Sequence, residues 1–115
     1  MSIGGGEVFR PLDLVGYQEG SVVSRQLLKG PSGSVTLFAF DAGEGLSEHT
    51  TPHDALVLVL DGRAEITVGG EAHEVGAGEG ILLPGGEPHA VAARERFIMS
   101  LVMLRKSNPT DSEAP

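Results

Sequence analysis

Cysteine and tryptophan are absent, and aromatic residues make up only 4% of the 115 residues. Without cysteine, the chain can form no disulfide bond, thiolate nucleophile or cysteine-ligated zinc site. Long apolar runs are also absent, since the longest, 55–60, is far shorter than the ~20 residues of a membrane-spanning helix. The opening residues lack the basic and apolar segments of a signal peptide, so we expect a cytoplasmic protein with no membrane partner.

Positive charge is scarce. Eight lysines and arginines stand against sixteen aspartates and glutamates, which gives a formal net charge of −8 at pH 7. An acidic surface repels phosphate backbones, so nucleic acid is not expected as a partner.

Glycine and proline are abundant, at 17 and 7 residues. They separate short apolar segments at intervals of about 8–12 residues, the spacing that favours an all-β sandwich or barrel. The length suits a single domain. Expected strands span residues 34–41, 55–60, 63–68, 71–75, 80–84, 88–93 and 97–104. Gly69 and Gly70 are expected to form a tight hairpin turn.

Three of these segments, 34–41, 55–60 and 97–104, are apolar on both faces. In a barrel the outer face of each strand would meet water unless something covered it. A second copy of the chain is the expected cover, which predicts a homodimer. The alternative is a second sheet of the same chain.

Two histidines stand in glycine-bounded patterns. Gly43, His49 and Gly62 fit a pattern of a glycine, five residues, His-x-His, three or four residues, a glutamate, six residues and a glycine. The second pattern is a glycine, five residues, Pro-x-Gly, two residues and a histidine, and it is matched at every position by Gly78, Pro84, Gly86 and His89.

These two patterns resemble the motifs of the cupin superfamily. The resemblance implies an all-β, single-domain, cupin-like barrel of the jelly-roll type over residues 20–104. Residues 1–19 would be an N-terminal arm, and 105–115 a disordered tail. Metal-dependent dioxygenation, isomerisation and decarboxylation are among the activities that the family implies.

The chain departs from the cupin metal-ligand set. The second histidine of the first motif is Thr51 here, and the glutamate is Ala55. A position of the second motif that often holds asparagine is Ala93. Of the usual four protein ligands only His49 and His89 remain.

His53 could supply a third imidazole, because alternate residues of an extended chain from His49 share one face. Pro52 could instead turn His53 toward solvent. Three imidazoles around an open position would suit a divalent transition metal: Zn, Fe, Mn, Ni or Cu. The alternatives are a metal-free pocket that uses His49 and His89 as hydrogen-bonding groups, and a packed barrel without a ligand.

The pocket is expected to be apolar and to suit a small, partly apolar molecule. Its expected lining is Thr51, Ala55, Val57, Leu83, Val91 and Met99, with Leu56, Ile81 and Met103 as alternatives to Val57, Leu83 and Met99. His73 is expected at the surface or the barrel edge. The sequence thus favours a metal-binding cupin of unassigned activity over a metal-free binding or sensing module and over a purely structural domain.

Overall fold

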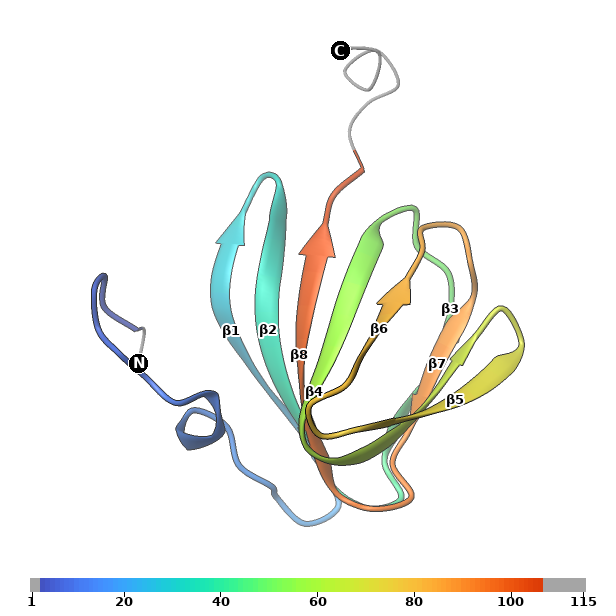
Figure 1. Ribbon diagram of the computed structural model, residues 1–115, viewed down its shortest axis with the longest axis horizontal. Helices are drawn as coiled ribbons and strands as arrows, with labels where there is room; N and C mark the ends of the chain where they lie inside the picture. The colour runs from blue at the N-terminus through green and yellow to red at the C-terminus, as the bar shows by residue number, and fades with distance from the viewer. Residues whose placement is uncertain (1–2, 107–115) are drawn as a thin grey trace.

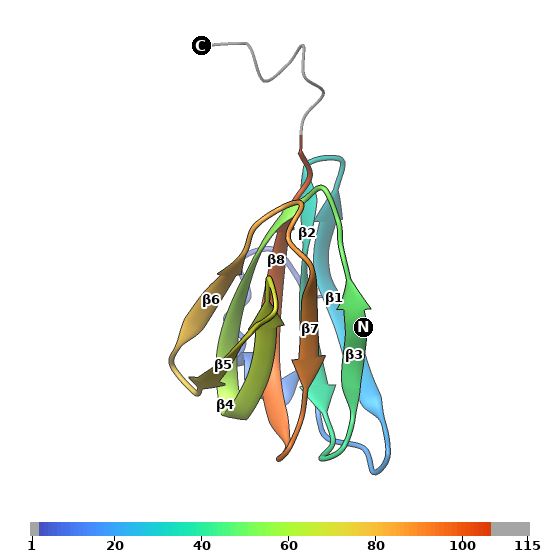
Figure 2. The same cartoon turned by 90° about the vertical axis from the view of Figure 1, so that its right-hand side faces the viewer.

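The computed structural model describes residues 3–106, and these form an eight-stranded antiparallel sheet that curls into a barrel-like cup (Figures 1 and 2). The prediction of an all-β barrel is confirmed. The strands are β1 (Val22–Gly30), β2 (Gly33–Phe40), β3 (Gly45–His49), β4 (Asp54–Val68), β5 (Glu71–Gly76), β6 (Gly80–Leu83), β7 (His89–Ala92) and β8 (Phe97–Leu104). Within residues 3–106, no helix has the length and apolar character needed to cross a membrane.

The strand order is β1-β2-β8-β4-β7-β3, and β5 and β6 also pair with β4. The first half of β4 pairs with β8 and β6, and its second half pairs with β7 and β5. One 15-residue strand therefore belongs to both walls of the cup. The sequence predicted two strands here, 55–60 and 63–68, and that division is wrong.

Gly62 allows β4 to continue through the bend. The register with β8 shifts between Val59 and Asp61, and Gly62 has a φ of +74°. A Cβ atom at Gly62 would lie 2.0 Å from the carbonyl oxygen of Arg96. Only glycine fits a left-handed conformation so close to a neighbouring backbone.

The hairpin predicted at Gly69 and Gly70 is confirmed. Both glycines have positive φ values, 58° and 84°, and Val68 pairs with Glu71 across the turn. Two strands were missed by the sequence analysis, β1 and β3. Of the predicted C-terminal tail, 105–115, all but residues 105 and 106 lie outside the described part of the chain.

The main core fills the concave side of the cup. Phe40 and Phe97 stack with ring centroids 4.5 Å apart, and Val57, Ile66 and Met99 are almost fully buried in the same cluster. Alternate residues along each strand face this core, as the period of a β-strand requires. The candidate site lies at one edge of this cluster.

A second apolar cluster lies on the convex side of β2 and β8. Leu37, Ala39 and Ile98 are buried there by Val15 of the N-terminal arm, and Leu14 and Tyr17 pack against them. The arm thus covers part of the outer face from within the same chain.

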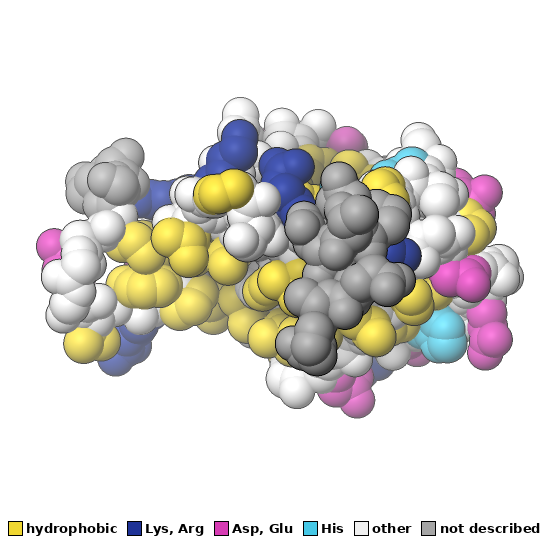
Figure 3. All heavy atoms as spheres, turned by 90° about the horizontal axis from the view of Figure 1, so that it is seen from above, with side chains coloured by type: hydrophobic (Ala, Val, Ile, Leu, Met, Phe, Trp, Pro, Cys, Tyr) yellow, Lys and Arg dark blue, Asp and Glu magenta, His cyan; other side chains and the backbone are white. Residues whose placement is uncertain are grey.

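The rest of the outer face is uncovered. Cross-strand pairs place Leu28, Val35, Val102, Leu56 and Leu82 in one row over β1, β2, β8, β4 and β6. We call this row the outer stripe. Its leucines are 40% to 68% exposed. Seen from above, hydrophobic side chains gather over the part of the molecule that holds the N-terminal arm, β1 and β2 (Figure 3).

Candidate functional site

His49 and His89 come together from adjacent strands at the edge of the core. His49 is the last residue of β3 and His89 the first of β7, and the two are direct cross-strand partners. Their rings meet edge to face, with centroids 4.3 Å apart. The two Nε2 atoms are 3.1 Å apart. The predicted convergence of these two imidazoles is therefore present in the structure.

Each ring is held by a backbone carbonyl group. The Nδ1 atom of His49 lies 3.0 Å from the carbonyl oxygen of Ser47, and that of His89 lies 3.3 Å from the carbonyl oxygen of Glu87. A carbonyl oxygen can only accept, so in both contacts Nδ1 is the donor and carries the proton. In the neutral form of each ring, Nε2 then presents a lone pair. The two Nε2 atoms lie 3.1 Å apart, within hydrogen-bonding distance, so a proton on one of them can be shared with the other.

The surroundings of His89 favour its neutral form. Burial is the main cause that lowers the pKa of His89, and nearby His49 lowers it further, while the hydrogen bond to the Glu87 carbonyl group partly opposes them. The neutral form of the His89 ring is therefore favoured. An ion bound by both Nε2 atoms would take the place of a proton between them.

A small cavity of about 110 Å³ adjoins the pair. Its walls are Leu46, His49, Thr51, Ala55, Leu83, His89, Val91, Met99, Leu101 and Met103. A cavity needs only about 10–15 Å³ of such volume to hold one water molecule, so this one has room for an ion and a small ligand. Apart from the two imidazoles and the Thr51 hydroxyl, the walls are aliphatic or thioether.

Five of the six predicted pocket residues line this cavity: Thr51, Ala55, Leu83, Val91 and Met99. Val57 does not, because it lies deeper in the core with no exposed area. Leu46 and Leu101 were missed. Leu101 lies between Met99 and Met103 on the same face of β8, so strand alternation could have found it. Leu46 could not be found in that way, because the pairing of β3 with β7 shifts register between Leu46 and His49.

The structure does not bring His53 to the pair. Strand β3 ends at His49, and β4 begins only at Asp54, so the alternation that would align His53 with His49 is broken. The Thr51 hydroxyl hydrogen-bonds to the backbone of His53 and stabilises a turn there. The Nδ1 atom of His53 accepts a hydrogen bond from the backbone N–H of Lys106, at 3.0 Å. Among residues 3–106, no group of three or more His, Cys, Asp or Glu side chains is arranged to hold a metal ion.

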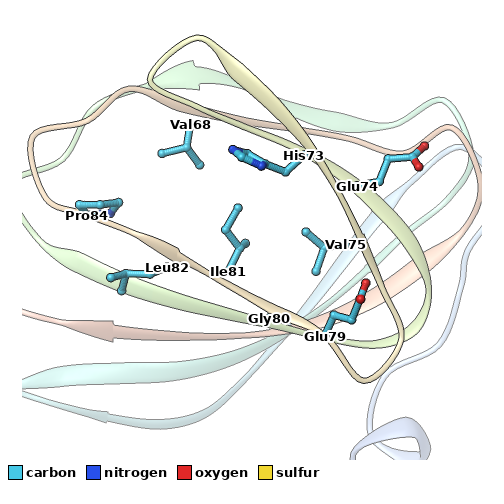
Figure 4. A pocket seen from close by; sticks show the side chains of 9 residues that line it. All are labelled: Val68, His73, Glu74, Val75, Glu79, Gly80, Ile81, Leu82 and Pro84. Atoms are coloured by element: carbon cyan, nitrogen blue, oxygen red, sulfur yellow. The ribbon is translucent and has the colours of Figure 1, made fainter.

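His73 lines a different hollow, which opens between β5 and β6 (Figure 4). Its ring points toward Val68 over a floor that includes Val75 and Ile81, whereas Glu74 points away. This hollow is larger, about 430 Å³, and shares no residue with the cavity of His49 and His89. His73 is half-buried at the edge of the cup, close to the predicted position.

Comparisons with known proteins agree with this architecture. Residues 36–104 match the model of the cupin domain family. A conserved protein of unknown function from Streptococcus pyogenes, SPY1581, has a crystal structure that superposes with a TM-score of 0.87. It is 33% identical, over 94% of this chain and 95% of that one. A cupin superfamily protein from Desulfitobacterium hafniense has a TM-score of 0.84 and 28% identity, over 92% of this chain and 97% of that one.

A third relative is the uncharacterized protein SCO3923 of Streptomyces coelicolor. It is 39% identical over 64 residues, which are 56% of this chain and 61% of the relative. This chain thus matches less than two thirds of the length of that relative. The family match covers more than half of the described residues and includes both histidines of the cavity. The chain therefore belongs to the cupin family.

Proposed function

We propose that this cupin holds a transition-metal ion between His49 and His89 and presents it to a small, partly apolar molecule in the adjoining cavity. The observation that carries the proposal is the 3.1 Å separation of the two Nε2 atoms at the cavity wall, with both Nδ1 atoms already engaged by carbonyl groups. This geometry leaves one nitrogen of each ring free to bind the same ion, in place of a proton shared between them.

The separation of the two nitrogens fits one shared ion. Bonds from a metal ion to imidazole nitrogen are about 2 Å long, so opposite ligands would be about 4 Å apart and adjacent ligands about 3 Å apart. The observed 3.1 Å corresponds to adjacent ligands. The other coordination positions would then face the cavity. Bound there, a Zn, Fe, Mn, Ni or Cu ion would act as a Lewis acid on an oxygen atom of the small molecule.

The residues of this chain would do three things around such an ion. The carbonyl groups of Ser47 and Glu87 fix the orientation and tautomer of the two rings. The aliphatic walls, among them Leu83 and Val91, exclude water and favour an apolar ligand. Thr51 is engaged with the backbone of His53 and shapes the rim.

Metal analysis of untagged protein tests this proposal. Wild-type protein, stripped and then titrated with Zn²⁺ and Co²⁺, should bind one ion per chain, and His49→Ala and His89→Ala should abolish binding. His73→Ala is the matched control, because His73 lines another hollow, and it should bind as the wild type does. His53→Ala should also be unaffected. Equal binding by the wild type and the His49→Ala variant would contradict the proposal.

The second candidate function is a metal-free pocket for a small molecule. The apolar lining of the cavity favours it, because only the imidazoles and Thr51 offer polar contacts. Chemical-shift mapping with a library of small apolar acids and alcohols distinguishes the two functions. Binding to stripped protein that is lost in His49→Ala and unchanged by added metal would favour the metal-free pocket.

We also propose that the outer stripe is covered by a second copy of the chain. The stripe crosses five strands, a width of about 20 Å at the usual spacing of about 4.8 Å, and exposed Leu58 and Leu104 flank it. A stable interface buries about 800 Å² on each partner. A two-fold axis would bring the same stripe from both copies together.

A further inference from the structure

The cavity beside the histidine pair is also lined by two thioethers. Met99 and Met103 both lie on β8 and face the cavity with His49 and His89. Met99 is 1% exposed and Met103 is half-buried. The Thr51 hydroxyl is already bonded to the backbone of His53. The donors left to an ion in this cavity are therefore two imidazole nitrogens and two thioether sulfurs, and none of the lining residues is a carboxylate.

The position where the first cupin motif has a glutamate lies next to one of these thioethers. Ala55 on β4 is the direct cross-strand partner of Met103 on β8, and both line the cavity. Because the methyl group of Ala55 is short, the space beside it is available to the flexible side chain of Met103. Where the cupin motif has an anionic oxygen ligand, this chain offers in exchange the neutral thioether of Met103 on the neighbouring strand.

This exchange changes which ions the cavity can hold. Two neutral imidazoles and two neutral thioethers leave the full charge of a bound ion uncompensated. The cost of moving an ion from water into a low-dielectric cavity rises with the square of its charge, so a divalent ion costs about four times as much as a monovalent one. Thioether sulfur is also a soft donor, which favours soft ions, whereas carboxylate favours hard ones.

We propose that this cavity selects monovalent copper, Cu(I), over divalent ions, and that Met99 and Met103 confer the selectivity together with His49 and His89. The inference rests on the proposed metal site of the two histidines and goes beyond it by naming the ion and two further ligands. Only binding is involved, with no change in the oxidation state of the ion.

Anaerobic competition against the chromophoric chelator bicinchoninate measures Cu(I) binding directly. Wild-type protein should withdraw one Cu(I) per chain from the chelator. The double variant Met99→Leu/Met103→Leu, in which size is nearly conserved, should bind Cu(I) roughly tenfold or more weakly. Its affinity for Zn²⁺, measured in parallel, should be unchanged. X-ray absorption of the Cu(I)-loaded wild type should show copper–sulfur scattering that the double variant lacks.

The outcomes separate this inference from the proposed function. Unchanged Cu(I) affinity in the double variant, with no copper–sulfur scattering in the wild type, would overturn the role of the methionines while the histidine site stands. If His49→Ala binds both Cu(I) and Zn²⁺ as tightly as the wild type does, the histidine site itself is overturned. Met103→Leu alone supplies a variant at a half-buried position, so a folding defect of the double variant cannot mask the result. Thermal unfolding of each variant checks that it is folded.

Discussion

Asp41 and Arg96 are joined by an ion pair in which the Nε atom of Arg96 donates to Oδ1 of Asp41 at 2.7 Å. The other carboxylate oxygen, Oδ2, accepts a hydrogen bond from the backbone N–H of Gly20, also at 2.7 Å. The Arg96 guanidinium also lies over the Tyr17 ring, 5.2 Å from its centroid. The Asp41 carboxylate, at the end of β2, therefore joins Gly20 before β1 to Arg96 before β8, and Arg96 in turn contacts Tyr17 of the N-terminal arm.

The Asp41→Asn variant should be less stable than the wild type at neutral pH. On acidification, its free energy of unfolding should fall by less than that of the wild type. The hydrogen bond from Arg96, and then that from Gly20, lower the pKa of Asp41 below its ordinary value of 3.8. Its contribution is thus fully present above pH 3.8 and is lost as the pH falls through the lower, folded value. Thermal unfolding at pH 7 and at pH 3 measures the difference. Asp13→Asn, at an exposed position, is the control, and an equal effect there would contradict the assignment.

Gly62→Ala should destabilise the fold more than Gly70→Ala. Both glycines have a positive φ, 74° and 84°, so both substitutions incur about 1–2 kcal/mol of backbone strain. At Gly62 the added Cβ would also meet the carbonyl oxygen of Arg96 at 2.0 Å, whereas at Gly70 nothing lies within 4 Å. Denaturant unfolding should show the larger loss at Gly62, by about 1 kcal/mol or more. Equal losses would mean that the bend of β4 can relax.

Ala55→Glu should shift the metal preference toward divalent ions. The carboxylate would face the cavity beside Met103, where it compensates the charge of a bound ion and supplies a hard oxygen ligand. Without metal, the same buried carboxylate should lower the unfolding temperature. Ala55→Gln has nearly the same size without the charge and is the control. Titration with Mn²⁺ and Zn²⁺ should show roughly tenfold tighter binding for the glutamate variant only.

Leu56→Glu should convert the proposed dimer to a monomer. Leu56 lies within the outer stripe, 40% exposed, between Leu82 and Val102. A charge buried at that interface without a partner costs several kcal/mol, whereas on a free surface it costs little. Light scattering coupled to size-exclusion chromatography gives the molar mass of the wild type and of the Leu56→Glu variant. A wild-type monomer at about 100 μM would contradict the dimer, since stable interfaces of this size bind far more tightly.

The sequence predicted the strands whose apolar residues alternate or run continuously. In such strands the residue pattern itself indicates which side chains are buried. It missed β3, in which four of five residues are exposed and whose strand geometry depends on pairing with β7. It also missed β1, where polar and apolar residues are mixed and a bulge falls between Gln26 and Leu28. These strands depend on pairing with a partner strand, and the residues of the segment alone do not predict that pairing.

The candidate site was likewise predictable where sequence motifs and regular strand alternation determine it. His49 and His89 stand in glycine-bounded motifs, and the cavity walls on β4 and β8 follow from alternation. Extending that alternation from His49 to His53 failed because it assumes an unbroken strand, and the turn at Thr51 breaks it. Leu46 entered the cavity through a register shift, which alternation cannot foresee. Local irregularity in the backbone, more than side-chain chemistry, accounts for the errors.

The bent strand β4 affects how the molecule folds and unfolds. Both walls of the cup share this strand, so we expect that opening of one wall weakens the other. Partial opening near the cavity is therefore coupled to the whole barrel through one continuous backbone. A ligand bound at the rim should slow hydrogen exchange in β5, none of whose residues lines the cavity.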